Sequence, residues 1–242
     1  MKRRELLVGL AAAAIAEGCT SQRSGSVQQS HAPESHAPES QAPESQAPYT
    51  NQIALPKPSV AGPVSLEEAI ERRRSVRTFG PGPLPVGTIG QLLWAGQGIT
   101  SPDGKRAAPS AGALYPLELY AVTAAEVMHY LPHGHRAETR VTPDLRPQLK
   151  AAALDQASVG EASVVIVVAA EPGRLSERYG GKAGLYTDLE VGHAAQNMLL
   201  QAVVRGLAAV PVGSFDASRV ARTLALPRGQ AVGYLIPVGF AA

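Results

Sequence analysis

The sequence is poor in several residue types, and each scarcity excludes a class of function. Only one of its 242 residues is a cysteine, Cys19, so neither an internal disulfide framework nor a site with several thiolate ligands can form. Aromatic residues make up 5% of the chain, and the formal net charge is only +2. A nucleic-acid-binding protein needs a basic surface and stacking side chains. We therefore expect no nucleic-acid partner.

Several motifs that carry familiar chemistry are also missing. The sequence has no GxGxxG opening a helix after a strand, no GxxxxGK[ST] and no GxSxG, so the usual cradles for dinucleotides and nucleoside triphosphates and the usual nucleophile elbow are absent. His129, His133 and His135 cluster at an expected hairpin tip, but the sequence shows no supporting groups that would orient their rings. We expect no metal site.

The N-terminal residues 1–19 have the layout of an export signal. A basic start with a twin-arginine-like Arg3-Arg4 pair precedes an apolar run from Leu6 to Ala16, which is too short to span a bilayer permanently. Two processing routes fit. Cys19 is lipidated as in a lipoprotein, which would tether the protein to the membrane outside the cytoplasm, or the signal is cleaved after Ala16.

Residues 20–60 are expected to form a disordered tether. A five-residue repeat of Pro, Ala, Glu, Ser and His or Gln fills residues 30–48, and such a sequence has little apolar surface to offset the entropy of ordering. Foldable sequence starts near residue 51, and we assign the folded domain to residues 61–242.

The folded domain alternates helical and strand patterns, which indicates an α+β fold with a central mixed β-sheet flanked by helices. Ser65 has the features of a helix N-cap, and apolar spacing predicts further helices around residues 89–96 and over residues 188–206. Strands are expected at residues 117–123, 127–131, 163–170, 210–214 and 232–238. The run VVIVV indicates a central strand buried on both faces.

The stretch ERRRSVRTFG is the strongest candidate for a binding site. If it continues a helix, Arg73 and Arg77 lie four residues apart on one side, and Ser75 adds a hydroxyl donor. Guanidinium groups match phosphate oxygens in pairs, so this arrangement favours a phosphate-bearing ligand. We expect Arg72 to be a solvated surface residue, and the role of Arg74 stays open.

Four segments in order resemble the nitroreductase-like FMN enzymes, most closely their SagB-type branch, which includes the azoline dehydrogenases. They are RRRSVRTF, APSAGALYPLELY, LEVGHAAQNMLLQA and AVPVGSFD. The resemblance implies a nitroreductase-like fold, bound FMN and a homodimer with two flavins at its interface, for which the helix at residues 188–206 is the natural contact. It also implies a small-molecule electron donor and acceptor that react in turn through the flavin.

The resemblance assigns the site residues. It implies that the phosphate and the pyrimidine side of the flavin are held near the first motif, that a loop reaches the flavin from the partner subunit, and that a later strand offers backbone amides to the reactive ring nitrogen. The matching residues are Arg73, Arg74, Ser75 and Arg77; Pro109, Ser110, Ala111 and Ala113; and Val212, Gly213 and Ser214. Tyr115 and Tyr179 are candidates for lining the substrate side of the flavin. Packing in the core is an equally good interpretation of both residues.

Three departures limit the resemblance. Phe240 stands where a basic residue often completes the phosphate clamp, and Arg178-Tyr179 replaces the Lys-Tyr pair of azoline dehydrogenases. Arginine cannot accept a proton near neutral pH, and an exported protein is a poor partner for a cytoplasmic peptide-modifying complex. We therefore expect an exported FMN-dependent oxidoreductase of unknown substrate. The alternatives are a flavin-binding or sensing lipoprotein without turnover, and an adhesion module on a stalk.

Overall fold

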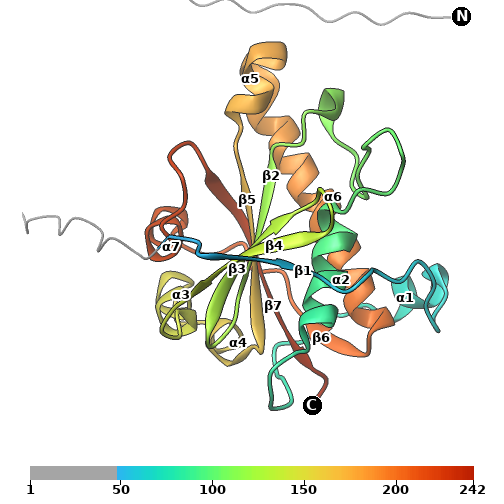
Figure 1. Cartoon of the computed structure of the whole chain (residues 1–242). Helices are drawn as coiled ribbons and strands as arrows, with labels where there is room; N and C mark the ends of the chain where they lie inside the picture. The colour runs from blue at the N-terminus through green and yellow to red at the C-terminus, as the bar shows by residue number, and fades with distance from the viewer. Residues whose placement is uncertain (1–47) are drawn as a thin grey trace, which may run out of the picture. The chain divides into compact units, whose positions relative to one another are not determined.

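The computed structural model describes residues 48–242, so the predicted export signal, Cys19 and the tether up to residue 47 lie outside the described residues. One seven-stranded sheet forms the centre of the molecule (Figure 1). The strands are β1 (Asn51–Ala54), β2 (Leu117–Val122), β3 (Glu126–Leu131), β4 (Arg136–Val141), β5 (Val164–Ala170), β6 (Leu207–Ala209) and β7 (Ala231–Phe240). The helices are α1 (Leu66–Arg72), α2 (Val86–Gln97), α3 (Arg146–Ala152), α4 (Ala157–Glu161), α5 (Gly173–Tyr179), α6 (Ala183–Val204) and α7 (Ala217–Leu224), with short 3-10 turns η1 (Ala111–Ala113) and η2 (Gly180–Lys182).

The strand order is β1-β4-β3-β2-β5-β7-β6, and every pairing in it is antiparallel. The α+β class is confirmed, but the prediction of a mixed sheet is wrong. A helical crossover from β5 to β6 does leave these two strands running in the same direction. They are not neighbours, however, because β7 lies between them and pairs antiparallel with both.

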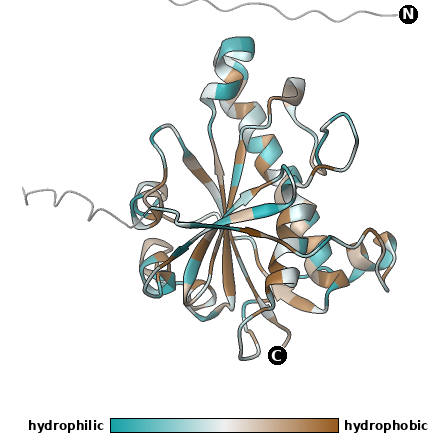
Figure 2. Ribbon diagram, in the orientation of Figure 1, coloured by the Kyte–Doolittle hydropathy of each residue, from teal (hydrophilic) through white to brown (hydrophobic). Residues whose placement is uncertain are grey.

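Strand β5 separates two hydrophobic cores, as its unbroken apolar sequence predicts. Val164, Ile166 and Val168 belong to the core under α2 and α6, whereas Val165 and Val167 belong to the core under α3, α4 and α7. All seven residues of β5 are buried. Figure 1 shows the two groups of helices on opposite sides of the sheet, and Figure 2 shows hydrophobic residues along the central strands between them.

The start of the folded part differs from the prediction. Asn51–Ala54 form β1 at the edge of the sheet and pair with β4, although the sequence places these residues in the tether. Tyr49 lies under the guanidinium group of Arg140, 5.1 Å from it, which fastens the chain just before β1. The folded part therefore begins before residue 61.

All three predicted helices are confirmed, and the one expected around residues 89–96 is α2, Val86–Gln97. The Ser65 side chain accepts a hydrogen bond from the Glu68 amide and caps α1, as its sequence predicts. Helix α6 begins at Ala183, five residues before the predicted start, because η2 leads directly into it. Within residues 48–242, no helix is both long and apolar enough to cross a membrane.

Candidate flavin site

The arginine segment, residues 73–77, is not helical. Helix α1 ends at Arg72, and Arg73 has φ and ψ angles of −57° and 119°, so the expectation that Arg73 and Arg77 lie on successive helical turns is wrong. After the helix the chain contacts the end of the sheet that β6 and β7 form. The Val76 amide donates to the carbonyl of Ala209 at the end of β6, and Gly80 bridges to Phe240 of β7.

The four arginines around this segment differ in whether their side chains have partners. Arg72 is held by a surface ion pair with Glu68, and Arg74 donates to the backbone carbonyls of Glu71 and Arg73. Among the residues that the structure describes, none bonds to or pairs with the side chains of Arg73, Ser75 or Arg77. Gly80, which follows this segment, bridges to Phe240. The residue expected to be basic, Phe240, is therefore an apolar neighbour of this part of the chain.

The predicted amide donors, residues 212–214, follow β6 in the chain. The stretch 210–214 contacts β7 at two points, where the Val210 amide donates to the Pro237 carbonyl and Val212 forms an isolated bridge to Leu235, so the predicted strand is not continuous. The Val212 amide is used in this bridge. The amides of Gly213 and Ser214 donate to no group within the described part of the chain, and both residues are exposed. The Val76 amide in the arginine segment donates to Ala209, and Gly213 follows Ala209 by four residues in the chain.

The loop 109–115 differs from the arginine segment, because its polar groups form hydrogen bonds within the chain. The Ala111 amide donates to the buried carboxylate of Glu190 at 2.8 Å, and the Ser110 hydroxyl oxygen accepts from the Tyr115 amide at 2.8 Å. The Ser110 hydroxyl also bonds to Glu190, whose pKa is raised by burial even though these two bonds favour its charged form. Gly112, Ala113 and Tyr115 all have left-handed φ angles.

Of the two candidate tyrosines, Tyr115 belongs to this loop and Tyr179 packs against it. The Tyr115 hydroxyl accepts from the Arg106 amide, and the guanidinium group of Arg106 lies 4.5 Å from the Tyr115 ring centre. Tyr179 approaches from α5: a Cβ atom at Gly112 would stand 2.9 Å from the Tyr179 hydroxyl and 2.9 Å from a guanidinium nitrogen of Arg178. Glycine is therefore favoured at residue 112 by the close approach and by its φ of 60°.

A charged cluster holds the far end of the loop. Arg174 donates to the Tyr115 carbonyl and to the carboxylate of Glu118, which also pairs with His129 at 2.9 Å. Burial alone would raise the pKa of Glu118, but the hydrogen bonds from His129 and Arg174 outweigh burial and lower it. His135 bonds to Tyr130 and to the Pro56 carbonyl instead, so these two predicted cluster members have different partners.

The loop and the arginine segment lie at different ends of α6. Glu190, near the start of α6, holds the loop, whereas Leu200 and Val204 near its end line a cavity shared with Leu66 and Ala69 of α1. Ten to fourteen residues of helix separate these contacts, or roughly 15–20 Å at 1.5 Å per residue. Within the described residues, no hydrogen bond joins the loop to the arginine segment.

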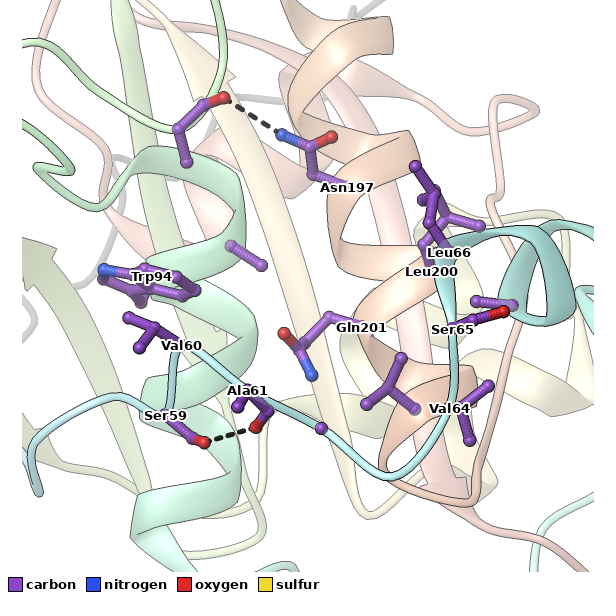
Figure 3. A pocket seen from close by; sticks show the side chains of 15 residues that line it. Ser59, Val60, Ala61, Val64, Ser65, Leu66, Trp94, Asn197, Leu200 and Gln201 are labelled. Carbon is purple, nitrogen blue, oxygen red and sulfur yellow. Dashed lines mark hydrogen bonds between the residues drawn. The ribbon is translucent and has the colours of Figure 1, made fainter.

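That shared cavity has a volume of about 410 Å³ and lies between residues 59–66, α2 and α6. Figure 3 shows Trp94 on one wall and Asn197 and Gln201 on the opposite one, with the Asn197 amide bonded to the Ala107 carbonyl. It is lined by apolar, hydroxyl and amide groups without any titratable side chain. None of the predicted flavin-binding residues lines it, so it is separate from the candidate site.

Comparison with known proteins decides the family. The family model described as "Nitroreductase family" matches residues 70–240. The chain belongs to the nitroreductase family. A protein of Methanocaldococcus jannaschii described as a nitroreductase is 35% identical over 182 residues, which cover 73% of this chain and 91% of the relative.

Solved structures agree with the nitroreductase fold. A nitroreductase from Ralstonia eutropha superimposes with a TM-score of 0.72 at 27% identity, covering 81% of this chain and 92% of that one. An NADPH:FMN oxidoreductase from Vibrio harveyi, solved with NAD⁺, superimposes with a TM-score of 0.55 at 24% identity, covering 72% of this chain and 68% of that one. The second likeness shows the shared fold alone.

Sequence reasoning missed the residues that hold the loop 109–115 in place. Glu190 occupies a buried position in the apolar stripe of α6, and a lone carboxylate in such a stripe was a usable signal. Arg174 gave no such signal, because its partners Tyr115 and Glu118 are 59 and 56 residues away in the chain.

Proposed function

We propose that this nitroreductase-family enzyme is an FMN-dependent oxidoreductase that transfers two electrons between small molecules in a ping-pong cycle. The observation that carries the proposal is that the side chains of Arg73, Ser75 and Arg77 have no partner within residues 48–242. The Val76 amide of the same segment donates to Ala209, and the unpaired amides of Gly213 and Ser214 follow shortly after Ala209 in the chain. Unpaired guanidinium groups together with unpaired amides suit a ligand that carries both phosphate and ring acceptors.

The residues present fit FMN. Arg73 and Arg77 would hold the phosphate and a negative charge on the pyrimidine side, and Ser75 would add a hydroxyl donor. The amides of Gly213 and Ser214 would orient the ring. When bound, the flavin supplies the two-electron chemistry, and the chain's own task is to bind it, orient it and place the small molecule against it.

A homodimer is part of this proposal. Leu185 and Leu189 on α6 are 58% and 51% exposed, and Gly192 continues the same helical stripe, where an added Cβ atom would meet no other part of the chain within 4 Å. A mid-helix glycine costs about 1 kcal/mol relative to alanine, which a close approach of a second helix would explain. A dimer would also let the loop 109–115 of one subunit serve the arginine segment of the other, which the loop does not contact in its own chain.

The finer assignments rest on the sequence. We propose that the enzyme is exported and lipid-anchored at Cys19, that it derives from the SagB-type branch, and that Tyr115 and Tyr179 line the substrate side. Reduced nicotinamide is scarce outside the cytoplasm. The donor is therefore either another small reductant or the substrate itself, with a quinone or oxygen as the acceptor.

The test starts from the purified full-length protein. Denaturation should release FMN in about one equivalent per chain, identified by chromatography, and a screen of donors followed by quinones and oxygen should reduce and reoxidise the bound flavin. Colourless protein that takes up no added FMN would overturn the proposal. Bound flavin that no donor reduces would instead favour the flavin-binding protein without turnover.

A further inference from the structure

Glu190 is a buried carboxylate that the proposed chemistry does not use. It lies on the second turn of α6, and only 4% of its surface is exposed. Removing a carboxylate from water is costly unless hydrogen bonds or a counter-charge compensate. A side chain of this kind inside a helix stripe therefore needs partners that justify its position.

Its partners belong to the loop 109–115. The Ala111 amide donates to a Glu190 oxygen at 2.8 Å, and the Ser110 hydroxyl bonds to the same carboxyl group. That hydroxyl in turn accepts from the Tyr115 amide, so a single side chain ties together both ends of the turn. Within residues 48–242, Glu190 forms no ion pair, and Arg106 and His193 act on it only as nearby charges.

The loop needs such support because its backbone is strained. Ala113 and Tyr115 have φ angles of 54° and 47°, a region that residues with a side chain rarely adopt, and Gly112 lies between the two bonded ends. Strained conformations persist only where surrounding contacts enforce them. The bonds to Glu190 and Ser110 are among those contacts, together with the bond from Arg174 to the Tyr115 carbonyl.

We propose that Glu190 is a positioning residue, which holds the loop 109–115 in the shape that receives the flavin of the partner subunit. The proposal rests on the proposed function. It reassigns the Ser110 hydroxyl and the Ala111 amide from flavin ligands to internal supports, so the loop would meet the flavin through the exposed Gly112 and Ala113. Flavin affinity then depends on a side chain that does not touch the flavin.

The experiment compares Glu190→Ala and Glu190→Gln with the matched control Glu177→Ala, an exposed glutamate on α5. Two readouts are needed: hydrogen exchange of the Ala111 and Tyr115 amides in flavin-free protein, and FMN affinity from fluorescence titration. We expect Glu190→Ala to raise both exchange rates and the FMN Kd at least tenfold. Glu190→Gln keeps an acceptor for Ala111 and should have smaller effects, whereas the control should match wild type.

The outcomes separate this proposal from the proposed function. Unchanged exchange in Glu190→Ala would show that the carboxylate does not hold the loop, and faster exchange with wild-type FMN affinity would show that the held shape does not matter for the flavin. Either result overturns the proposal alone. Wild-type protein that binds no FMN would overturn the proposed function with it. If Glu190→Ala does not fold, the same comparisons apply to the isosteric Glu190→Gln.

Discussion

The arginine segment 73–77 and the loop 109–115 differ in where their polar groups find partners. In the arginine segment the side chains of Arg73, Ser75 and Arg77 bond to nothing else within residues 48–242. In the loop, Ser110 and Ala111 are both bonded to Glu190. One region has unused binding capacity, and the other has a conformation fixed in advance.

If both regions contact the flavin, as we propose, this difference represents two ways in which one chain prepares a ligand site. Unpaired guanidinium groups cost little at the surface, where water solvates them, and they gain charged hydrogen bonds when an anion arrives. A strained loop has to be held before the ligand arrives, since ordering it during binding would consume affinity. We expect substitutions in the arginine segment to affect ligand binding alone, and substitutions around the loop to affect stability as well.

The largest effect should come from replacing both arginines of the first region. Arg73→Ala with Arg77→Ala removes charged hydrogen bonds of on the order of 1.5 to 3 kcal/mol each, which raises the FMN Kd roughly a hundredfold or more. The flavin-free double variant should unfold at the wild-type temperature, because neither side chain has a partner to lose within the described residues. Fluorescence titration and calorimetry measure the two quantities.

Arg72→Ala is the matched control for that variant. It removes only a surface ion pair with Glu68, which is worth at most about 1 kcal/mol, and should leave flavin affinity unchanged. Full FMN occupancy in the Arg73 and Arg77 double variant would show that these arginines are ordinary surface charges, and the contrast between the two regions would disappear.

A smaller effect is expected at the proposed dimer interface on α6, which would bring the two regions of different subunits together. Gly192→Leu adds a bulky side chain to the exposed stripe of α6 and should weaken the dimer about tenfold to a hundredfold, because overpacking costs about 1 to 3 kcal/mol. Sedimentation at several concentrations measures this. The monomer has open space at residue 192, so its thermal stability should not fall. A variant that dimerises like wild type would place the interface elsewhere.

The smallest effect should come from the support of the loop at Glu118. Its folded-state pKa is lowered, so its stabilising effect is present above the ordinary value of about 4.5 and is lost as the pH falls through the folded value. Glu118→Gln should lower the unfolding free energy by about 1 to 2 kcal/mol at pH 6 to 7. The difference from wild type should shrink below pH 4.5. Urea unfolding across pH 3.5 to 7 measures it, and a constant difference would contradict this assignment.

Local patterns predicted the parts of the fold that depend on local structure. The Ser65 cap, the apolar stripe of α6 and the two buried faces of β5 each follow from residues close together in sequence. Strand order does not, because β7 inserts between two strands made earlier in the chain. Strand β6 spans only three residues, Leu207–Ala209, which is too short to give an alternating pattern.

The candidate site shows the same division. The types of residue around Ser75 indicated an anion site, but their helical geometry was wrong because no glycine or proline marks the end of α1. Glu190 and Ala111 are 79 positions apart, and no spacing rule connects residues at that separation. Sequence therefore predicted which groups could bind a ligand, and only the structure showed which of them are already used.

The position of β7 has a consequence for how the protein is made. During synthesis β5 and β6 emerge before β7, so until β7 has been made the edge of β5 that faces it has no partner strand. Pairings between such distant segments form slowly and leave apolar edges exposed in the meantime. A chaperone that shields this edge of β5 until β7 has been made should therefore raise the yield of folded protein.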